Sequence, residues 1–333
     1  MNPPITPMSL GDIFDTLFKL LGRTALRNLI LSAIILLPAA LISIYGLEAL
    51  FSSLAEFLRD RAAGRAAATA EMARLFGVLG TYLLVILLLL LAYLAAALGA
   101  TIVACSEISG QAISWQEALR RVFSVRLART WGQSFLAFLA LVGIILAAYL
   151  VLIAAVVADS SAMEGIGVIA LLLGICAAVY FWVRWIFALP AIAWEGAGVM
   201  ESFRRSSFLV NGWWWRTFGI GLLLYLITQF AITLVTTPLS FVALWGFFKN
   251  YFALLGSASG GQPDPDIVYR LFDSLGVGLG ILIYISYILT AMIVPLFVAI
   301  MYFDLRARKG EFAQSLPPQP LMNGESGSSN GNP

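Results

Sequence analysis

The stretch FGVLGTYLLVILLLLLAYLAAALGATIVA, residues 76–104, contains 29 residues and no charged side chain. A helix needs about 20 mainly apolar residues to cross a hydrocarbon core about 30 Å thick. In lipid the backbone cannot hydrogen-bond to water, so the stretch must satisfy its own amides, as a helix does. The sequence therefore predicts a transmembrane helix here.

Five further apolar stretches meet the same length criterion: residues 29–47, 135–158, 166–192, 217–239 and 275–303. Of the whole chain, 61% of residues are hydrophobic and 11% are charged, whereas a soluble domain has about 25% charged residues. This composition excludes a water-soluble fold. We predict an all-α membrane domain of six transmembrane helices over residues 1–310 and a disordered tail over residues 311–333, where Pro, Gly, Ser and Asn dominate.

Lysine and arginine are unevenly divided between the two ends of the predicted helices. Thirteen lie on the side of the chain ends and six on the other side. Cytoplasmic segments of membrane proteins carry the excess of these residues. We therefore predict that both termini are cytoplasmic.

The segments that precede the first, third and fifth predicted spans resemble one another. They read SLGDIFDTLFKLLGR from Ser9, SWQEALRRVFSVRLA from Ser114 and GVMESFRRSSFLVNG from Gly198. Each has an acid three positions after its first residue, which is the spacing of a helix capping box, and apolar residues at helical spacing behind it. The pattern predicts three repeats, each an interfacial amphipathic helix followed by a transmembrane hairpin.

The residue inventory argues against familiar catalytic centres. Histidine is absent, and the two cysteines, Cys105 and Cys176, lie far apart in apolar runs. Their separation and the lack of histidine exclude Ser-His and Cys-His nucleophile pairs and offer no thiolate metal site. We expect no cofactor and no metal, and the net charge of +2 gives no reason to expect a nucleic-acid partner.

Three acids lie at comparable positions near the ends of the returning helices: Glu107, Glu195 and Asp304. They could converge as an acidic ring able to bind a cation. Alternatively, each pairs with neighbouring basic residues, namely Arg120, Arg121, Arg204, Arg205 and Arg306.

Arg184, in FWVRWIFALP, is the basic residue inside a predicted span. It either snorkels to headgroups or pairs with a nearby acid, or it recognises an anion such as a lipid phosphate. Pro190 and Pro295, within the fourth and sixth predicted helices, lack an amide and should bend or interrupt them.

Other candidate lipid contacts flank the spans. Arg120, Arg121, Arg204 and Arg205 lie on the polar faces of the second and third openings. A further set of candidates consists of consecutive indoles that favour the bilayer interface: Trp213, Trp214 and Trp215.

The fifth predicted helix carries Tyr225, Gln229 and Thr233 at spacings of four, which places them on one face. We expect this face to turn inward, towards Tyr284 and Tyr287 of the sixth helix, because lipid tolerates polar groups poorly. The contact would be either a set of interhelical hydrogen bonds or the lining of a cavity.

The runs SFRRSSFLVNGWWWRTFGIGLLL and VPLFVAIMYFDLRARKGEF, with the opening SLGDIFDTLFKLLGR, resemble the bacterial glycerophosphoryl diester phosphodiesterase membrane-domain family. The resemblance implies a membrane region without the soluble catalytic domain that gives the family its name. It implies no catalytic residues here.

These observations favour a non-enzymatic, multi-pass protein of a bacterial inner membrane that engages anionic lipid or a protein partner. The protein partner could be a second copy of the same chain. One alternative is a transporter or lipid-handling protein with a polar cavity between the fifth and sixth helices. The other is a membrane enzyme that acts on lipid headgroups.

Overall fold

The structure is a computed structural model that describes residues 7–62, 68–158, 160–258 and 265–312. Within these ranges it is all-helical, and six helical stretches are long and apolar enough to cross a membrane. They are Leu10–Arg59, Phe76–Ile108, Val125–Val157, Ala162–Glu195, Trp214–Ala243 and Tyr269–Arg308. Each overlaps one predicted span, so the six predicted spans are confirmed by length and composition.

The long helices are α1 (Leu10–Ala62), α2 (Ala68–Ile108), α4 (Val125–Val157), α5 (Ser161–Trp185), α8 (Trp214–Ala243) and α11 (Gly276–Arg308). The short helices are α3 (Trp115–Val122), α6 (Ala188–Pro190), α7 (Val199–Val210), α9 (Trp245–Ala258) and α10 (Pro265–Asp273). One π-helical turn, η1 (Ala191–Glu195), follows α6.

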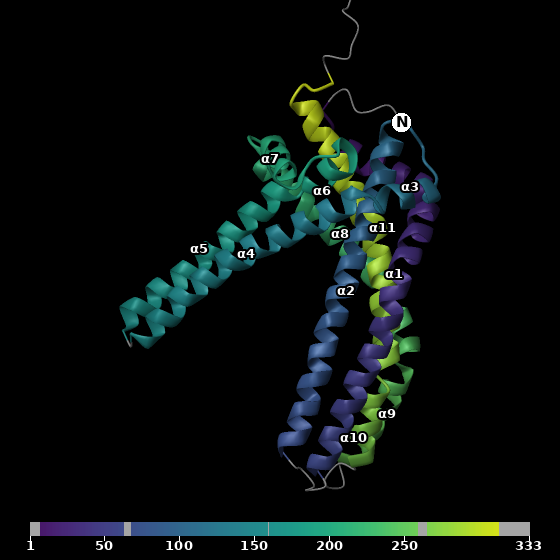
Figure 1. Ribbon diagram of the computed structural model, residues 1–333, viewed down its shortest axis with the longest axis vertical. Coiled ribbons are helices and arrows are strands. Elements are labelled where there is room, and N and C mark those ends of the chain that lie inside the picture. The colour runs from purple at the N-terminus through teal and green to yellow at the C-terminus, as the bar shows by residue number, and fades with distance from the viewer. Residues whose placement is uncertain (1–6, 63–67, 159, 259–264, 313–333) are drawn as a thin grey trace, which may run out of the picture.

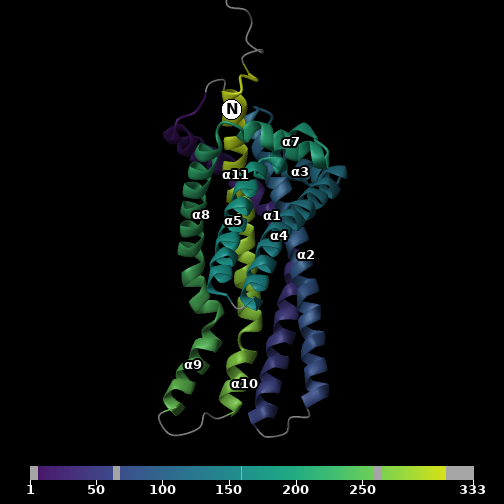
Figure 2. The same ribbon diagram turned by 90° about the vertical axis from the view of Figure 1, so that its left-hand side faces the viewer.

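The long helices form a bundle and a separate arm. Helices α1, α2 and α11 run side by side, and α8 lies along α11 (Figures 1 and 2). Helices α4 and α5 pair with each other and lean away from the bundle as an arm (Figure 1). The arm joins the bundle at one end, where α3, α6 and α7 also lie; we call this the junction end.

Glycines allow the closest contacts between the long helices. A Cβ added at Gly174 of α5 would lie 2.5 Å from Cβ of Ala148 on α4. A Cβ added at Gly276 of α11 would lie 2.5 Å from Cα of Glu48 on α1. Larger residues at either glycine would force the helices apart, because small residues are what lets backbones approach in membrane bundles.

The first predicted interfacial helix does not exist as a separate element, so that prediction is wrong. Helix α1 runs unbroken from Leu10 through the first predicted span to Ala62. The second and third openings do form separate short helices, α3 and α7. Ser124 caps α4 directly after α3, and Gly212 turns the chain after α7 with a φ of +82°. The first opening has no such stop before the span, so the helix continues.

The fourth span breaks near Pro190, as predicted. Helix α5 ends at Trp185, and α6 and η1 continue the path to Glu195. The side chain of Ser206 on α7 repairs the break: its Oγ accepts from the Phe187 amide at 3.1 Å and donates to the Arg184 carbonyl at 2.7 Å. Pro295, in contrast, does not interrupt α11.

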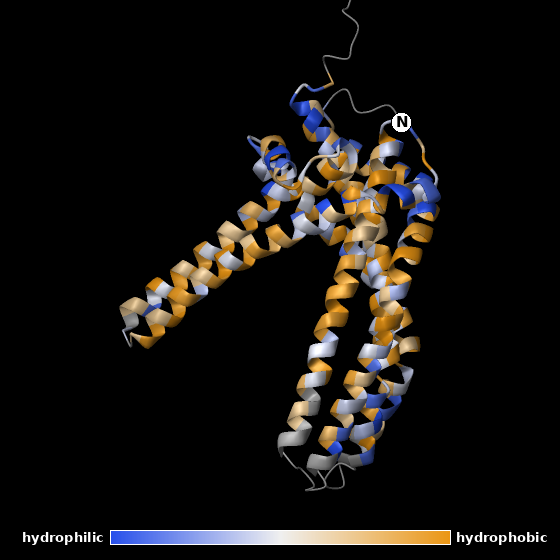
Figure 3. Ribbon diagram, viewed as in Figure 1, coloured by the Kyte–Doolittle hydropathy of each residue, from blue (hydrophilic) through white to orange (hydrophobic). Residues whose placement is uncertain are grey.

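The largest buried core lies at the junction end. Side chains from α1, α2, α5, α7, α8 and α11 meet there around Phe187 and Tyr302, which have no exposed area. Figure 3 shows hydrophobic residues along the middle of the long helices and hydrophilic residues gathered at the two ends of the molecule. The junction end therefore combines a tight core with a polar surface.

Candidate functional site

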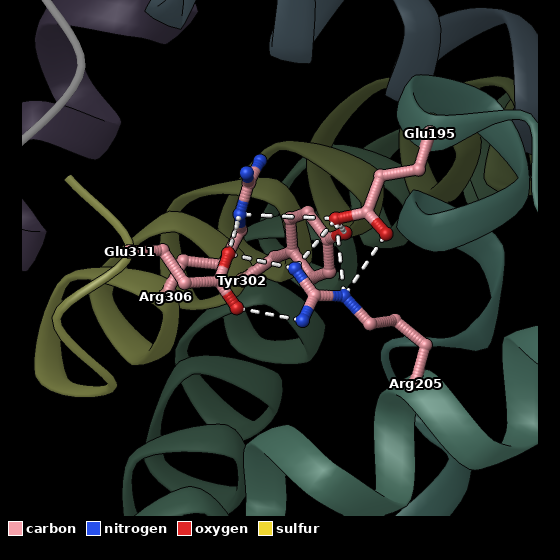
Figure 4. A network of polar contacts seen from close by, with 5 residues as sticks. All are labelled: Glu195, Arg205, Tyr302, Arg306 and Glu311. Atoms are coloured by element: carbon pink, nitrogen blue, oxygen red, sulfur yellow. Dashed lines mark hydrogen bonds and ion pairs between the residues drawn. The ribbon is translucent and has the colours of Figure 1, made fainter. Parts of the chain in front are cut away.

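Glu195 forms the centre of a charged network at the junction end (Figure 4). The Arg205 guanidinium donates to it twice, from Nη2 at 2.8 Å and from Nε at 2.9 Å, and the Tyr302 hydroxyl donates to it as well. Arg205 also donates to both carboxylate oxygens of Glu311, at 2.6 and 2.7 Å. Nε of Arg306 donates to Glu311 at 2.7 Å and lies 3.8 Å from Glu195. Two acids and two arginines thus neutralise one another.

Burial and hydrogen bonding act in opposite directions on these groups. Burial alone would raise the pKa of Glu311, but hydrogen bonds from Arg205 and Arg306 outweigh it and lower the pKa below its usual value. Burial alone would lower the pKa of Arg205, but its bonds to Glu311 and Glu195 outweigh burial and raise the pKa. Both shifts favour the ionised forms, the Glu311 carboxylate and the Arg205 guanidinium.

Glu311 was expected in the disordered tail, and that boundary is wrong by two residues. Beside the bonds of Glu311, the ring of Phe312 stacks on Phe303 at a centroid distance of 6.2 Å. Residues 313–333 of the predicted tail lie outside the described residues. The KGEF segment contains an acid and an aromatic ring within reach of the end of α11, which is the signal that sequence reasoning missed.

Asp304 holds the first described residues of the chain. Its carboxylate accepts from the Met8 amide at 2.8 Å and from Nε of Arg308 at 3.0 Å, and Nη2 of Arg216 lies 3.4 Å away. Both arginines also donate to the Met8 carbonyl, at 2.7 and 2.8 Å. The segment before α1 and the end of α11 are thereby tied together at one end of the molecule.

Glu107 is paired in the same manner. Nη2 of Arg27 on α1 donates to it at 2.6 Å, and Nη1 of Arg23 lies 4.0 Å away. The second Arg27 amine donates to the Ile113 carbonyl at 2.8 Å, which ties the loop before α3 to α1.

The three predicted acids therefore bind arginines and do not form a ring. Among the residues that the structure describes, no group of three or more His, Cys, Asp and Glu side chains could hold a metal ion. The pairing alternative is right for Glu195, which meets Arg205 and Arg306. It is wrong for Glu107, whose partners come from α1 because α1 and α2 lie side by side, and for Asp304, whose partners are Arg216 and Arg308.

Five arginines at the junction end form no ion pair with any described residue: Arg120, Arg126, Arg129, Arg184 and Arg204. They line two open hollows. The first, of about 480 Å³, is lined by Arg120, Arg121, Ser124, Val125, Arg126, Arg129 and Gly196. The second, of about 390 Å³, is lined by Arg184, Phe203, Arg204, Ser207, Phe208 and Asn211.

Arg184 lies where the arm meets α7. It donates to the Tyr180 hydroxyl at 3.0 Å, and its guanidinium lies 5.9 Å from the centre of the same ring. The predicted pairing with an acid is not seen among the described residues. From the sequence, Arg184 and Arg204 were separate candidates for contact with lipid. The structure shows that both line the same hollow.

The three tryptophans point in different directions, and their anchoring at the bilayer interface stays a prediction. Trp213 lies under the Arg308 guanidinium at 4.9 Å, and Trp214 donates to the Tyr180 carbonyl at 3.2 Å. Only Trp215, with 78% of its surface exposed, faces outward. Consecutive helical residues are rotated by about 100°, so three in a row cannot share one face.

The polar face of α8 points outward, against prediction. Tyr225 is 45% exposed, and Gln229 and Thr233 are exposed beside it. The face that α8 buries is instead made of Thr217, Ile220, Leu224, Thr228 and Ile232. The Gln229 amide donates to the Tyr225 hydroxyl at 3.1 Å within its own helix, which reduces the cost of its exposure.

Tyr284 and Tyr287 of α11 do not meet these α8 residues. Tyr284 donates to the Ala33 carbonyl on α1 at 3.0 Å, and Tyr287 contacts Tyr93 of α2 at a centroid distance of 5.3 Å. The proposed cavity between the fifth and sixth spans is therefore not formed by these five residues. They divide between an outward face and the contact of α11 with α1 and α2.

The chain was compared with known proteins. No family model, no curated protein and no solved structure matches it.

Proposed function

We propose that this polytopic membrane protein engages anionic lipid through the arginines of its junction end, and that this end faces the cytoplasm of a bacterial inner membrane. The observation that carries the proposal is the division of the arginines into two classes. Those bound to Glu107, Glu195, Asp304 and Glu311 hold the fold together. The five without an ion pair line open hollows, where anionic headgroups can reach them.

Exposed apolar side chains beside the hollows support the proposal. Phe123 is 64% exposed next to the first hollow, and Phe208 is 53% exposed on the second. Trp215 is exposed at the start of α8. Cations together with aromatic and aliphatic side chains are what a protein surface needs at the boundary between headgroups and acyl chains.

The ion pairs also support an internal repeat, which we infer from two equivalent arginines. Arg27 and Arg216 lie 18 positions after Ser9 and Gly198, the first residues of the first and third openings. Each binds the acid of its own returning helix, Glu107 and Asp304 respectively. In the second opening the residue 18 positions after Ser114 is Gly132, so this part of the pattern is missing there; Arg129, three positions earlier, donates to the Gly196 carbonyl next to Glu195. Membership of the resembled membrane-domain family remains a proposal.

The two alternatives find less support. A polar cavity between α8 and α11 would need Gln229 and Thr233 to face inward, and both are exposed. An enzyme would need acids free to act at the headgroup boundary, and the three candidate acids bind arginines.

The outward face of α8 would suit a protein partner or a second copy, because amides can hydrogen-bond across helices.

The proposal is tested by the lipids that the full-length protein retains. The protein is purified from vesicles that contain equal amounts of phosphatidylglycerol and phosphatidylcholine, and its bound lipids are identified by native mass spectrometry. The test variant removes three unpaired cations from the junction end: Arg120→Gln, Arg184→Gln and Arg204→Gln. The control variant removes three from the opposite end: Arg59→Gln, Lys249→Gln and Arg270→Gln.

We expect phosphatidylglycerol to be enriched on the wild-type and control proteins, and this enrichment to fall in the test variant. No enrichment on the wild type, or equal loss in both variants, would refute the proposal. Orientation is tested separately with a cysteine at Arg121, which an impermeant thiol reagent should not label in intact cells.

A further inference from the structure

The first hollow carries more positive charge than the single negative charge of one phosphodiester group balances. It lies between the end of α3, the start of α4 and Gly196, and four arginines line it: Arg120, Arg121, Arg126 and Arg129. The one acid bound to any of them is Glu117, which accepts from Nε of Arg121 at 3.0 Å. Three positive charges therefore remain without a carboxylate partner among the described residues.

The structure fixes the backbone from which these cations extend and holds the side chain of one of them, Arg129. Phe123 and Ser124 form the turn between α3 and α4, and Oγ of Ser124 donates to the Arg121 carbonyl at 2.7 Å and accepts from the Arg126 amide. Arg129 donates to the Gly196 carbonyl, which Gly196 presents from a left-handed conformation with a φ of +70°. A residue with a side chain would be strained at this φ, so the carbonyl position depends on glycine.

Guanidinium groups held close together repel one another unless an anion lies between them. Phosphate oxygens match the fork of N–H donors on arginine and can accept two bonds from each group. A phosphate monoester carries about −1.5 to −2 charges at pH 7, whereas a diester carries one. Three unbalanced cations therefore favour the monoester, and a volume of about 480 Å³ is large enough for a headgroup.

We propose that the α3–α4 hollow is a binding site for a dianionic phosphate, either the phosphomonoester headgroup of a lipid or a soluble phosphate. The lipid form rests on the proposed function above. Phe123 and Val125, 64% and 62% exposed, flank Ser124 on the turn itself. Their position next to the arginines allows them to enter the acyl boundary while the phosphate binds, which favours the lipid source.

The experiment is a titration of the full-length protein in detergent, followed by native mass spectrometry. The probes are phosphatidic acid, which is a monoester, and phosphatidylglycerol with the same acyl chains, which is a diester. The test variant, Arg120→Gln with Arg126→Gln, removes two lining cations that have no ion pair. The matched control, Arg184→Gln with Arg204→Gln, removes two cations from the second hollow of the same end.

We expect the wild type to bind phosphatidic acid about tenfold more tightly than phosphatidylglycerol. The affinity for phosphatidic acid should fall about tenfold in the test variant and by less than about twofold in the control variant. Arg126→Lys, which keeps the charge and lacks the fork, should retain part of the affinity and so guards against a variant that fails to fold. Equal loss in the test and control pairs, or equal affinity for the two lipids, overturns the proposal.

Inorganic pyrophosphate distinguishes the two sources. If it displaces phosphatidic acid from the wild type, the hollow accepts soluble phosphate. If phosphatidic acid binds and pyrophosphate does not displace it, the lipid source is supported. Pyrophosphate binding that depends on Arg120 and Arg126, without binding of either lipid, would refute the proposed function and keep this site. Binding of neither probe overturns the site itself.

Discussion

Replacing Asp304 by Asn should be among the most damaging conservative changes in the chain. The substitution keeps the shape of the side chain, of which 2% is exposed, and removes its charge. Arg308 and Arg216, with 14% and 26% exposed, would lose the one carboxylate that each of them binds within the described part of the chain. Breaking a buried ion pair costs roughly 3–5 kcal/mol. Because both arginines keep their bond to the Met8 carbonyl, we expect a loss of about 3 kcal/mol in unfolding free energy.

The assay is equilibrium unfolding in mixed micelles, with Asp15→Asn as the matched control. Asp15 binds Lys19 at 2.5 Å, but the side chains are 64% and 59% exposed, and an exposed pair contributes about 0–1 kcal/mol. A variant at Asp304 that is no less stable than the variant at Asp15 would refute the reasoning that burial decides the contribution of these ion pairs.

Three further predictions follow from the same geometry. Since the pKa of Glu311 is lowered in the folded state, its stabilising contribution is present above the ordinary value of 4.5 and is lost as the pH falls through the lowered pKa. The protection of amides at the end of α11 against hydrogen exchange, relative to their intrinsic exchange rate at each pH, should therefore fall below about pH 4.5, and a Glu311→Gln variant should lack this acid step. Ser206→Ala should lower the unfolding free energy by about 1–3 kcal/mol, because the Phe187 amide loses its partner at the helix break, whereas Ser207→Ala, whose hydroxyl has no such contact, should change it by less than about 0.5 kcal/mol. Gln229→Leu should leave the stability of the monomer unchanged within about 0.5 kcal/mol, while the same change at the buried neighbour Thr228 should destabilise it by about 1–3 kcal/mol; a larger loss at Gln229 than at Thr228 would show that the outward face is covered.

Local patterns predicted the elements well because their causes are local. Apolar runs of sufficient length became the six long helices, and Pro190 broke the fourth span because a missing amide acts on its own helix. The capping spacing at Ser114 also formed as expected, with the Ser114 hydroxyl accepting from the Glu117 amide at 3.2 Å. The prediction of a separate helix in the first opening was wrong, because the capping and apolar pattern marks where a helix begins and not where it ends.

Partner choice in the candidate site was less predictable. Glu107 and Asp304 occupy comparable sequence positions, and each binds an arginine far away in the chain, at separations of 80 and 88 residues, while Asp304 also binds Arg308 four residues away. Glu311 was assigned to a tail because its neighbours are polar, although two arginines were within reach once α7 and α11 had met. Spacing along one helix reveals pairs such as Asp304 with Arg308, whereas pairs between helices form only between residues that the fold brings together.

By itself the sequence determined that this chain crosses a membrane, how many times, and which end carries most of its cations, because hydrophobic length and charge position are properties of each segment alone. Only the tertiary structure decided which of those cations are neutralised. Contacts between helices pair Arg205 and Arg216 with acids, and Arg306 and Arg308 pair with acids near the end of α11. Five of the six arginines that line the two hollows have no ion pair with a described residue. The physical reason is that an ion pair between helices forms only where the fold brings the two side chains together. The convergence of α2, α7, α8 and α11 is a property of the whole fold.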